Sequence, residues 1–312
     1  MGNTIIFSDL HTNIFAAKYL EKKMATAEDV WSLGDFFGRG PHIEETALFV
    51  DDYIKKYPYW VLGNHDAYVW DLVSKAVKAR YKRTTAETLD YHAEKLSKFS
   101  GDLKSHFIPE RASLRWVDDF FALVHSTPDD PMGITSSVVR PFHSETPLMD
   151  NLILPFMKLT EKRNGQSKKM PNALLFCGHS HFPLFVNYHK ERGFVNYDEK
   201  IRYGKTIKIP DGITILNPGS VGNPRIGSNT FIELDREKHQ LTFHAFRLSS
   251  RCKAELVADS TDLGFPGEEK VTFNAPPDKE KIRAEEVEYY KIINTRENAG
   301  KIPETGNEFC FR

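Results

Sequence analysis

Residues that commonly bind transition metals occur in five short groups spread along the chain. In chain order these groups are Asp9-Leu10-His11, Gly34-Asp35, Gly63-Asn64-His65-Asp66, His125 and Gly178-His179-Ser180-His181. Imidazole and carboxylate ligands together suit Mn, Fe, Zn or Co, whereas oxygen ligands alone would indicate Mg or Ca. The sequence therefore predicts a transition-metal site assembled from distant parts of the chain.

A short apolar run precedes each of these groups. The runs are Ile5-Ile6-Phe7, Val30-Trp31-Ser32-Leu33, Trp60-Val61-Leu62, Phe121-Ala122-Leu123-Val124 and Leu174-Leu175-Phe176-Cys177. Runs of this length are typical of buried strands. In open α/β sheets the loops that leave the carboxyl ends of the strands converge on one crevice. Five strands, each followed by ligand residues, can therefore bring these side chains to one point.

In this order the groups resemble the signature of the calcineurin-like metallophosphoesterase superfamily, which reads D-x-H, G-D, G-N-H-D/E, H and G-H-x-H. The resemblance covers residues 4 to about 247. It implies a four-layer α/β/β/α sandwich with two mixed β-sheets and no separate cofactor domain. The implied activity is that of a dinuclear phosphoesterase, which hydrolyses a phosphodiester or a phosphomonoester by attack of a metal-bound hydroxide.

The resemblance also implies how two divalent transition-metal ions are held. Asp35 bridges them. Asp9, His11 and His181 complete the ligand set of one ion, and Asn64, His125 and His179 complete that of the other. Manganese is the first expectation for both positions, with iron, zinc, cobalt or nickel as alternatives.

Three further residues are candidates for catalysis. His65 is not a ligand in the family pattern, which makes it the general acid that protonates the departing oxygen or hydrogen-bonds to it. Asp66 either orients a neighbouring group or caps the helix that follows. Arg39 lies on a turn between Gly38 and Gly40, where its guanidinium either binds the phosphate or braces the loop.

One departure from the family bears on the substrate. Many members, the protein Ser/Thr phosphatases among them, carry G-D-x-x-D-R-G, in which the second Asp supports the catalytic His. This chain has Gly38 at that position, which argues against a protein phosphatase and resembles bacterial phosphodiesterase-like members that read G-D-x-x-G-x-G-P. The Gly-rich stretch at residues 217–225 also fits that group. Its Gly219 and Gly222 serve either a tight turn or backbone amides aimed at a phosphate.

The favoured substrate is a small phosphorylated molecule or a nucleotide. A dinucleoside polyphosphate hydrolase would share every ligand, and a protein Ser/Thr phosphatase stays an alternative. A metal-binding interaction scaffold of the same fold is the non-enzymatic alternative, and the complete ligand set argues against it. The sequence does not indicate an oligomeric state.

Composition limits the partners and the location. The 312 residues contain 42 Lys and Arg against 43 Asp and Glu, so no overall basic field attracts nucleic acid or anionic lipid. No apolar run reaches the length of a membrane helix. The first predicted strand ends at Asp9 and leaves no room for a secretory signal. Three scattered cysteines favour a reducing compartment over a disulfide framework, so the expected location is cytoplasmic.

Domain organisation and several elements are also predicted. Residues 1–263 form the metallophosphoesterase domain, and residues 264–312, rich in Pro and charge, form a C-terminal appendage with a charged helix at 279–293. Apolar residues at helical spacing predict helices over 68–82 and 86–99. Residues 126–150 form a candidate substrate loop, and residues 192–208 a polar hairpin.

Overall fold

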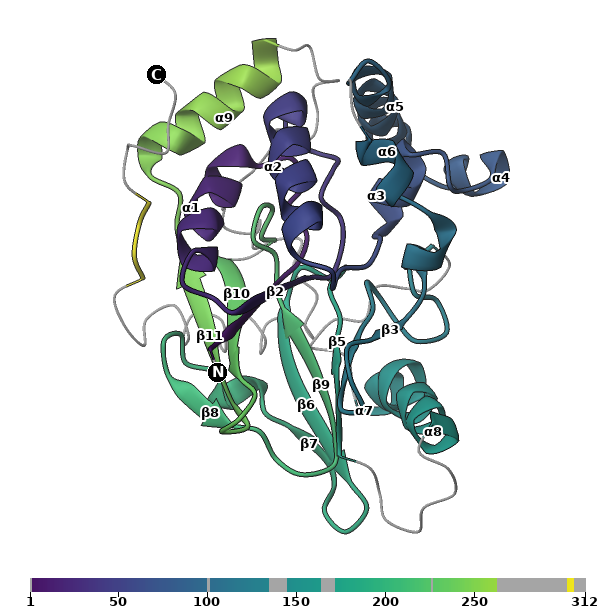
Figure 1. Ribbon diagram of the computed structural model, residues 1–312, viewed down its shortest axis with the longest axis vertical. Helices are drawn as coiled ribbons and strands as arrows, with labels where there is room; N and C mark the ends of the chain where they lie inside the picture. The colour runs from purple at the N-terminus through teal and green to yellow at the C-terminus, as the bar shows by residue number, and fades with distance from the viewer. Residues whose placement is uncertain are drawn as a thin grey trace, which may run out of the picture.

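Two mixed β-sheets pack face to face between outer layers of helices in the computed structural model (Figure 1). The structure describes residues 2–99, 102–134, 145–163, 172–225, 227–262 and 302–305. This is the four-layer α/β/β/α sandwich with two mixed β-sheets that the sequence predicts.

The first sheet carries the N-terminal strand. Within the described residues its order is β2-β1-β10-β11-β8, where β1 and β2 are parallel and the remaining neighbours are antiparallel. The strands are β1 (Thr4–Phe7), β2 (Asp29–Ser32), β8 (Thr206–Lys208), β10 (Asn229–Asp235) and β11 (Gln240–Phe246). Alternation along β1 sends Ile5 and Phe7 to the outer helices and Ile6 to the second sheet. Both faces of this sheet are therefore buried.

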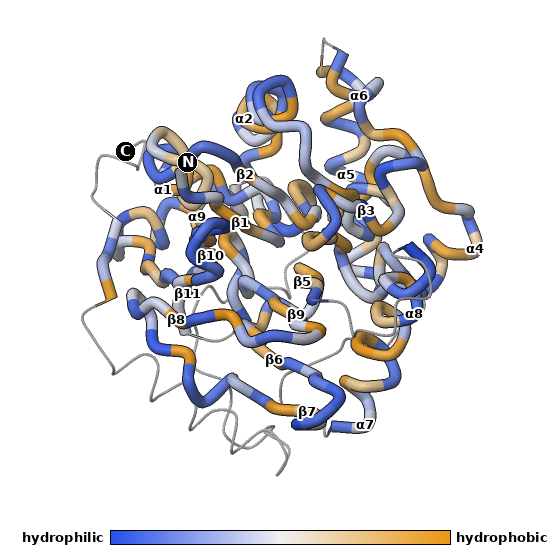
Figure 2. The backbone as a smooth tube through the Cα atoms, turned by 60° about the horizontal axis from the view of Figure 1, so that its bottom comes forward, coloured by the Kyte–Doolittle hydropathy of each residue, from blue (hydrophilic) through white to orange (hydrophobic). Residues whose placement is uncertain are grey.

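The second sheet has the order β3-β4-β5-β9-β6-β7 within the same residues. Its strands β4, β5 and β9 are parallel to one another. The bounds are β3 (Arg115–Trp116), β4 (Phe121–Leu123), β5 (Ala173–Phe176), β6 (Pro183–His189), β7 (Gly193–Asn196) and β9 (Ile213–Pro218). Leu174 and Phe176 face the first sheet, whereas Ala173 and Leu175 face the opposite helices. Figure 2 shows the resulting hydrophobic stretches at β5 and β9.

Helices from the first half of the chain and α9 cover the outer face of the first sheet (Figure 1). They include the helices that follow the segments of Asp9 and Asp35 and the helix that Asn64 opens. The bounds are α1 (Ile14–Met24), α2 (Ile43–Lys56), α3 (Asn64–Val69), α4 (Lys75–Lys78), α5 (Arg83–Ser97), α6 (Leu103–His106), the 3-10 helix η1 (Pro109–Ala112) and α9 (Ser250–Asp262).

One continuous helical stretch covers the outer face of the second sheet. It consists of α7 (Glu145–Leu148), the π-helical η2 (Met149–Ile153) and α8 (Leu154–Arg163). Leu152, Ile153 and Phe156 are buried against that face, and the Phe156 ring stacks on Trp116 at 5.5 Å between ring centroids. The remaining short helix is η3 (Asp198–Lys200), a 3-10 turn between β7 and β8.

The predicted helix over residues 68–82 is wrong. Helix α3 ends at Val69, and Asp71 has φ +60°, a left-handed conformation that stops the helix. A short helix, α4, follows before α5 begins at Arg83. The second predicted helix, at 86–99, is confirmed, since α5 spans most of it.

The predicted hairpin at residues 192–208 is also wrong. Strand β7 pairs with β6 in the second sheet, and β8 pairs with β11 in the first. The two halves of this segment thus find partners in different sheets, because non-local pairing outweighs the local turn.

The predicted charged helix at 279–293 and most of residues 264–312 lie outside the described residues. The described piece, 302–305, lies beside the end of β11. The amide of Arg247 donates to the carbonyl of Pro303 at 2.9 Å, and the amide of Thr305 donates to the carbonyl of Arg247 at 2.8 Å. Cys252 of α9 is disulfide-bonded, which contradicts the argument from cysteine number for a reducing compartment. No helix in the described part is long and apolar enough to cross a bilayer.

Candidate metal centre

The residues predicted as metal ligands lie together at the carboxyl ends of neighbouring strands. Asp9 and His11 follow β1, and Asp35 follows the parallel strand β2. His125 follows β4, and His179 and His181 follow the parallel strand β5. Asn64 opens α3 four residues after Trp60, which makes a parallel bridge to Ser32 of β2. The strand-then-ligand pattern of the sequence therefore produces one cluster.

One half of the cluster contains Asp9, His11 and His181. The Nε2 atoms of His11 and His181 are 3.1 Å apart. Asp9 Oδ1 lies 3.2 Å from Nε2 of His181 and 3.6 Å from Nε2 of His11. All three side chains are almost entirely buried.

The other half contains Asn64, His125 and His179. Nδ1 of His179 lies 3.0 Å from Oδ1 of Asn64 and 3.2 Å from Nε2 of His125. Asp35 joins the two halves, because its Oδ2 is 3.7 Å from Nε2 of His11 and 3.4 Å from Nε2 of His125. One oxygen of Asp35 is thus close to histidine nitrogens of both halves.

The hydrogen bonds of the histidines test whether a cation fits. Nδ1 of His11 donates to the carbonyl of Phe37 at 3.2 Å, and Nδ1 of His181 donates to the carbonyl of Asn223 at 2.6 Å. A neutral imidazole carries one N–H, so both Nε2 atoms present lone pairs to each other across 3.1 Å. Asp9 Oδ1 beside them accepts no hydrogen bond from the described residues. Such a cluster of acceptors is repulsive unless a cation lies among them.

The spacing of the donor atoms agrees with this test. Metal–nitrogen and metal–oxygen bonds of about 2.0–2.2 Å place neighbouring ligand atoms about 3.0–3.4 Å apart. The distances between neighbouring potential ligand atoms in the cluster run from 3.0 Å to 3.7 Å. The residues present therefore fit transition-metal ions.

Three glycines beside the ligands leave space that no side chain could share. A Cβ atom on Gly63 would lie 1.9 Å from Oδ1 of Asp35, and one on Gly178 would lie 1.9 Å from Oγ of Ser8. A Cβ on Gly34 would meet the backbone nitrogen of Gly63 at 2.4 Å. The Gly residues of the sequence groups are thus required by close packing around the ligands.

The ligand loops have an unusual backbone conformation. The φ angles of Asp9, His11, Asp35, His179 and His181 lie between 50° and 64°. Non-glycine residues rarely adopt this left-handed conformation, and it concentrates at functional sites where surrounding structure holds it in place. Here the loops hold one another, since the amide of His11 donates to the carbonyl of Asp35 at 3.0 Å.

Burial and mutual charge shift the titration of the cluster. Burial is the largest single influence on Asp9 and raises its pKa, but His181, His11 and His125 together outweigh burial, and the pKa falls well below its usual value. Burial lowers the pKa of His179 to about 3 and that of His181 to about 4. Burial lowers the pKa of His125, but the charge and hydrogen bond of Asp35, with Asp9 and the carbonyl of Leu33, together outweigh burial and raise the pKa to about 9. In the metal-free protein a proton on His125 thus compensates Asp35.

His65 lies at the edge of the cluster. Its ring centroid is 4.9 Å from that of His11, and it shares a group of potential ligand atoms with His11 and Asp35. Its Nδ1 is buried and has no hydrogen-bond partner among the described residues. A Cβ atom on Gly38 would lie 2.3 Å from this nitrogen, so the ring fills the space where a side chain at position 38 would be.

Asp66 braces the backbone around Asp35. Its Oδ2 accepts hydrogen bonds from the amides of Asp35 at 2.8 Å and Gly63 at 3.2 Å, and its Oδ1 accepts one from Phe37 at 3.1 Å. Burial, followed by the charge of Asp35, raises the pKa of Asp66 to about 8. The contacts match the capping alternative, with Asp66 supporting two loops as well as the start of α3.

Gly219 and Gly222 in the 217–225 turn match the tight-turn alternative. The amide of Gly222 donates to the carbonyl of Asp9 at 3.1 Å, and the amide of Gly219 donates to Oδ1 of Asn217 at 2.8 Å. A Cβ atom on Gly222 would lie 1.7 Å from the carbonyl oxygen of Leu10. The Gly222 amide therefore holds the loop after β1, and the Gly219 amide closes the turn itself, so both amides are already engaged within the protein.

Two supporting residues are not predicted from the sequence. Tyr81 hydrogen-bonds to Asn64, although its spacing is that of an ordinary apolar position in the helix predicted over 68–82. Nδ1 of the fully buried His92 accepts a hydrogen bond from the backbone amide of Gly38 at 3.1 Å. Nothing in the spacing of these two residues indicates that they contact the site, because both contacts depend on how α4 and α5 fold back.

The predicted substrate loop at 126–150 is described at residues 126–134 and 145–150. Residues 145–150 belong to α7 and the start of η2, so the loop ends earlier than predicted. Its Gly133 lies over His179, since a Cβ atom there would be 2.7 Å from Cε1 of that ring. Residues 135–144 lie outside the described residues. Arg39, with φ +72°, is half-buried on the turn after Asp35.

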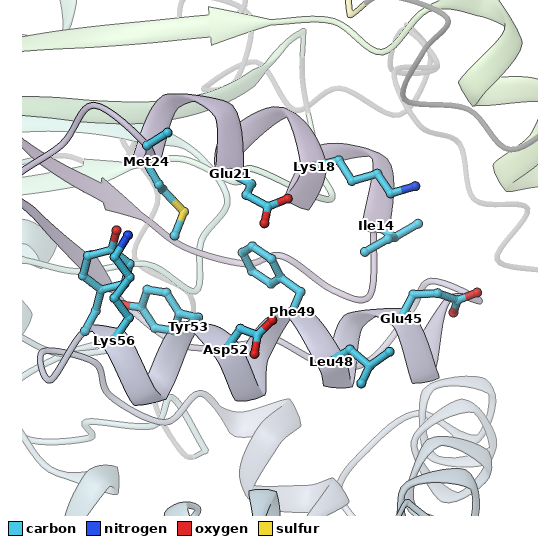
Figure 3. A pocket seen from close by; sticks show the side chains of 12 residues that line it. Ile14, Lys18, Glu21, Met24, Glu45, Leu48, Phe49, Asp52, Tyr53 and Lys56 are labelled. Carbon is cyan, nitrogen blue, oxygen red and sulfur yellow. The ribbon is translucent and has the colours of Figure 1, made fainter.

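A separate cavity of about 470 Å³ lies between α1 and α2 (Figure 3). Glu21 of α1 and Asp52 of α2 point toward each other across it, and Glu45 lines one end. None of the cluster residues lines it. The cavity is therefore separate from the metal centre.

Comparison with known proteins agrees with this arrangement. Residues 3–239 match the model of the calcineurin-like phosphoesterase superfamily domain. A metallophosphoesterase from Sphaerobacter thermophilus is 21% identical over 87% of this chain and 97% of its own, with a TM-score of 0.62. A hypothetical protein from Pyrococcus horikoshii is 15% identical over 96% of this chain and 100% of its own, with a TM-score of 0.59. Among curated proteins no match is found. The chain belongs to the calcineurin-like phosphoesterase superfamily of metal-dependent phosphoester hydrolases.

Proposed function

We propose that this protein is a dinuclear metal-dependent phosphoesterase that hydrolyses a phosphodiester or phosphomonoester of a small molecule or nucleotide. The observation that supports this most is the pair of Nε2 lone pairs on His11 and His181, 3.1 Å apart beside Asp9. The second half of the cluster, joined through Asp35, provides for a second ion. Manganese is the first candidate for both positions.

In this proposal Asp35 is the bridging ligand. Asp9, His11 and His181 hold one ion, and Asn64, His125 and His179 hold the other. When bound, such ions supply an activated water for attack on phosphorus and neutralise charge on the phosphate.

The remaining steps fall to side chains at the edge of the cluster. His65 protonates the oxygen that leaves phosphorus, since its ring lies 4.9 Å from His11 and it is not needed as a ligand. Arg39 binds the non-bridging oxygens of the phosphate through two N–H groups. Asp66 keeps the loops of Asp35 and Asn64 in register through its backbone hydrogen bonds.

Gly38 weighs against a protein Ser/Thr phosphatase. In those family members an Asp at this position supports the catalytic His. Gly38 has φ +90°, and a Cβ atom there would lie 2.3 Å from Nδ1 of His65. An Asp could not occupy this backbone conformation without moving His65, so the phosphatase arrangement does not suit this chain.

A substrate panel tests the proposed function. Protein loaded with manganese is assayed against bis-p-nitrophenyl phosphate, p-nitrophenyl phosphate, cyclic nucleotides, a dinucleoside polyphosphate and a phosphopeptide, with the chelated protein as control. We expect metal-dependent hydrolysis of at least one small ester and none of the phosphopeptide. Two bound ions without hydrolysis of any ester would favour the scaffold alternative, and turnover of only the phosphopeptide would contradict the substrate class. A cytoplasmic location and the role of residues 264–312 stay predictions of the sequence.

A further inference from the structure

Tyr81 contacts one of the proposed ligands twice. Nδ2 of Asn64 donates to the Tyr81 hydroxyl at 3.1 Å, and that hydroxyl donates to the backbone carbonyl of Asn64 at 3.1 Å. The two hydrogen bonds hold the side chain and the backbone of Asn64 against the same oxygen. Tyr81 lies between α4 and α5, where the sequence predicted part of a continuous helix.

These contacts decide which end of the Asn64 amide faces the cluster. An Asn side chain has one oxygen with lone pairs and one NH₂ group that can only donate. With NH₂ directed to Tyr81, the oxygen lies 3.0 Å from Nδ1 of His179. Only this orientation presents a ligand to a cation, and a flipped amide would present N–H groups instead.

The chain makes a detour that brings Tyr81 to this position. In a continuous helix, residues 68 and 81 would be about 20 Å apart at 1.5 Å per residue. Instead Asp71 ends the first helix, and the Tyr68 and Tyr81 rings pack edge to face with centroids 5.0 Å apart. Lys78 pairs with Asp71 at 2.8 Å and lies 4.6 Å above the Tyr68 ring. The segment predicted as one helix over residues 68–82 therefore folds back on itself, and its Tyr81 contacts Asn64.

We infer that Tyr81 is a positioning residue for one of the two metal ions, through the amide of Asn64. This inference rests on the proposed dinuclear function. Because both hydrogen bonds go to Asn64, the loss of the hydroxyl weakens the ion held by Asn64, His125 and His179. The ion held by Asp9, His11 and His181 is unaffected.

Titration with Mn²⁺ alone tests this inference. In Tyr81→Phe we expect one of the two sites to weaken by about 10- to 100-fold, as for other groups that orient a ligand, while the second keeps its wild-type affinity. At two equivalents of Mn²⁺ the exchange-coupled electron paramagnetic resonance signal of a metal pair should give way to the six-line signal of isolated Mn²⁺. Tyr68→Phe is the matched control, since its hydroxyl donates to the exposed Asp90 at 3.0 Å rather than to a ligand.

A double-mutant cycle isolates the effect. In an Asn64→Ala background, Tyr81→Phe should cause no further loss of Mn²⁺ affinity. Unchanged affinity at both sites, equal weakening of both, or full additivity in the cycle would overturn the inference while the proposed function stands. Wild-type protein that binds fewer than two Mn²⁺ ions would instead overturn the proposed function itself. Circular dichroism and thermal unfolding of the metal-free variants identify any simple folding defect, which would weaken both sites.

Discussion

His65 is the residue whose proposed role depends most on the leaving group. A general acid contributes about 100-fold or more when the departing oxygen needs a proton, and little when nitrophenolate departs. His65→Ala should therefore lower kcat by about 100-fold or more for an alkyl ester and much less for a nitrophenyl ester. Steady-state kinetics with both substrates at saturating Mn²⁺ provide the measurement.

His244→Ala is the control, because His244 pairs with Glu233 at 2.9 Å in the first sheet and lies outside the cluster. It should leave both rates unchanged. Metal content should stay normal in the His65 variant. Loss of an ion, or equal damage with both leaving groups, would show that His65 is a ligand or a structural residue instead.

Arg39 is expected to act on the substrate without regard to the leaving group. Two of its N–H groups can bind two phosphate oxygens, so Arg39→Ala should raise KM or lower kcat/KM for alkyl and nitrophenyl esters alike. Arg39→Lys keeps the charge but loses the paired geometry and should recover only part of the loss. Wild-type kcat/KM in Arg39→Ala would assign the residue to bracing the turn.

At the residue scale the sequence predicted which residues would lie together, because each belongs to a recognisable group that follows an apolar run, and their roles as ligands stay a proposal. Asp66 shows the limit of that reasoning. Its type and position fit both a helix cap and a catalytic role. Only the hydrogen bonds that Asp66 accepts from three backbone amides distinguish these alternatives. Tyr81 and His92 gave no signal, since their spacing is that of ordinary helix residues.

At the scale of elements, α5 supports the turn that carries Arg39. Nδ1 of His92 accepts the amide of Gly38 at 3.1 Å, and burial lowers the pKa of His92 to about 3. The imidazole is therefore neutral and acts as an acceptor. Without it, the buried amide loses its partner, so His92→Leu should destabilise the metal-free protein by about 1–3 kcal/mol at pH 7.

The difference in unfolding free energy between wild type and His92→Leu should shrink as the pH falls. Unfolded His92 takes up a proton near pH 6.5, whereas the folded residue does so only near pH 3. Wild-type protein thus loses about 1.4 kcal/mol per pH unit through His92 between these values, and the Leu variant does not. Urea unfolding of both proteins at pH 7 and pH 5 measures the change. A difference that stays constant would mean that His92 is not a buried neutral acceptor.

The elements that the sequence predicted correctly are those with a strong local pattern. The helix at 86–99 has apolar residues at regular spacing and is confirmed by α5. The prediction of a helix at 68–82 is wrong because its apolar period continues through Asp71, whose left-handed backbone conformation ends the helix. The hairpin at 192–208 failed because β7 and β8 pair with strands that are distant in sequence.

At the scale of the whole molecule, the two sheets explain why ligands from five segments meet. Parallel pairs β1–β2 and β4–β5 end at the same edge of the sandwich, and their loops bind one another. The sequence predicted the four layers through its family resemblance. It did not predict the strand order, which depends on the pairing of β10 with β1 and of β9 with β5 across long stretches of chain.

The central claim is that Asp35 joins two metal ions that are required for hydrolysis. The most direct test follows the rate of bis-p-nitrophenyl phosphate hydrolysis through chelation and readdition of Mn²⁺, for wild type and Asp35→Asn. We predict that wild-type activity disappears on chelation and returns with about two Mn²⁺ ions per chain. Asp35→Asn should bind both ions weakly and stay almost inactive. Full activity of chelated Asp35→Asn without added metal would contradict the claim.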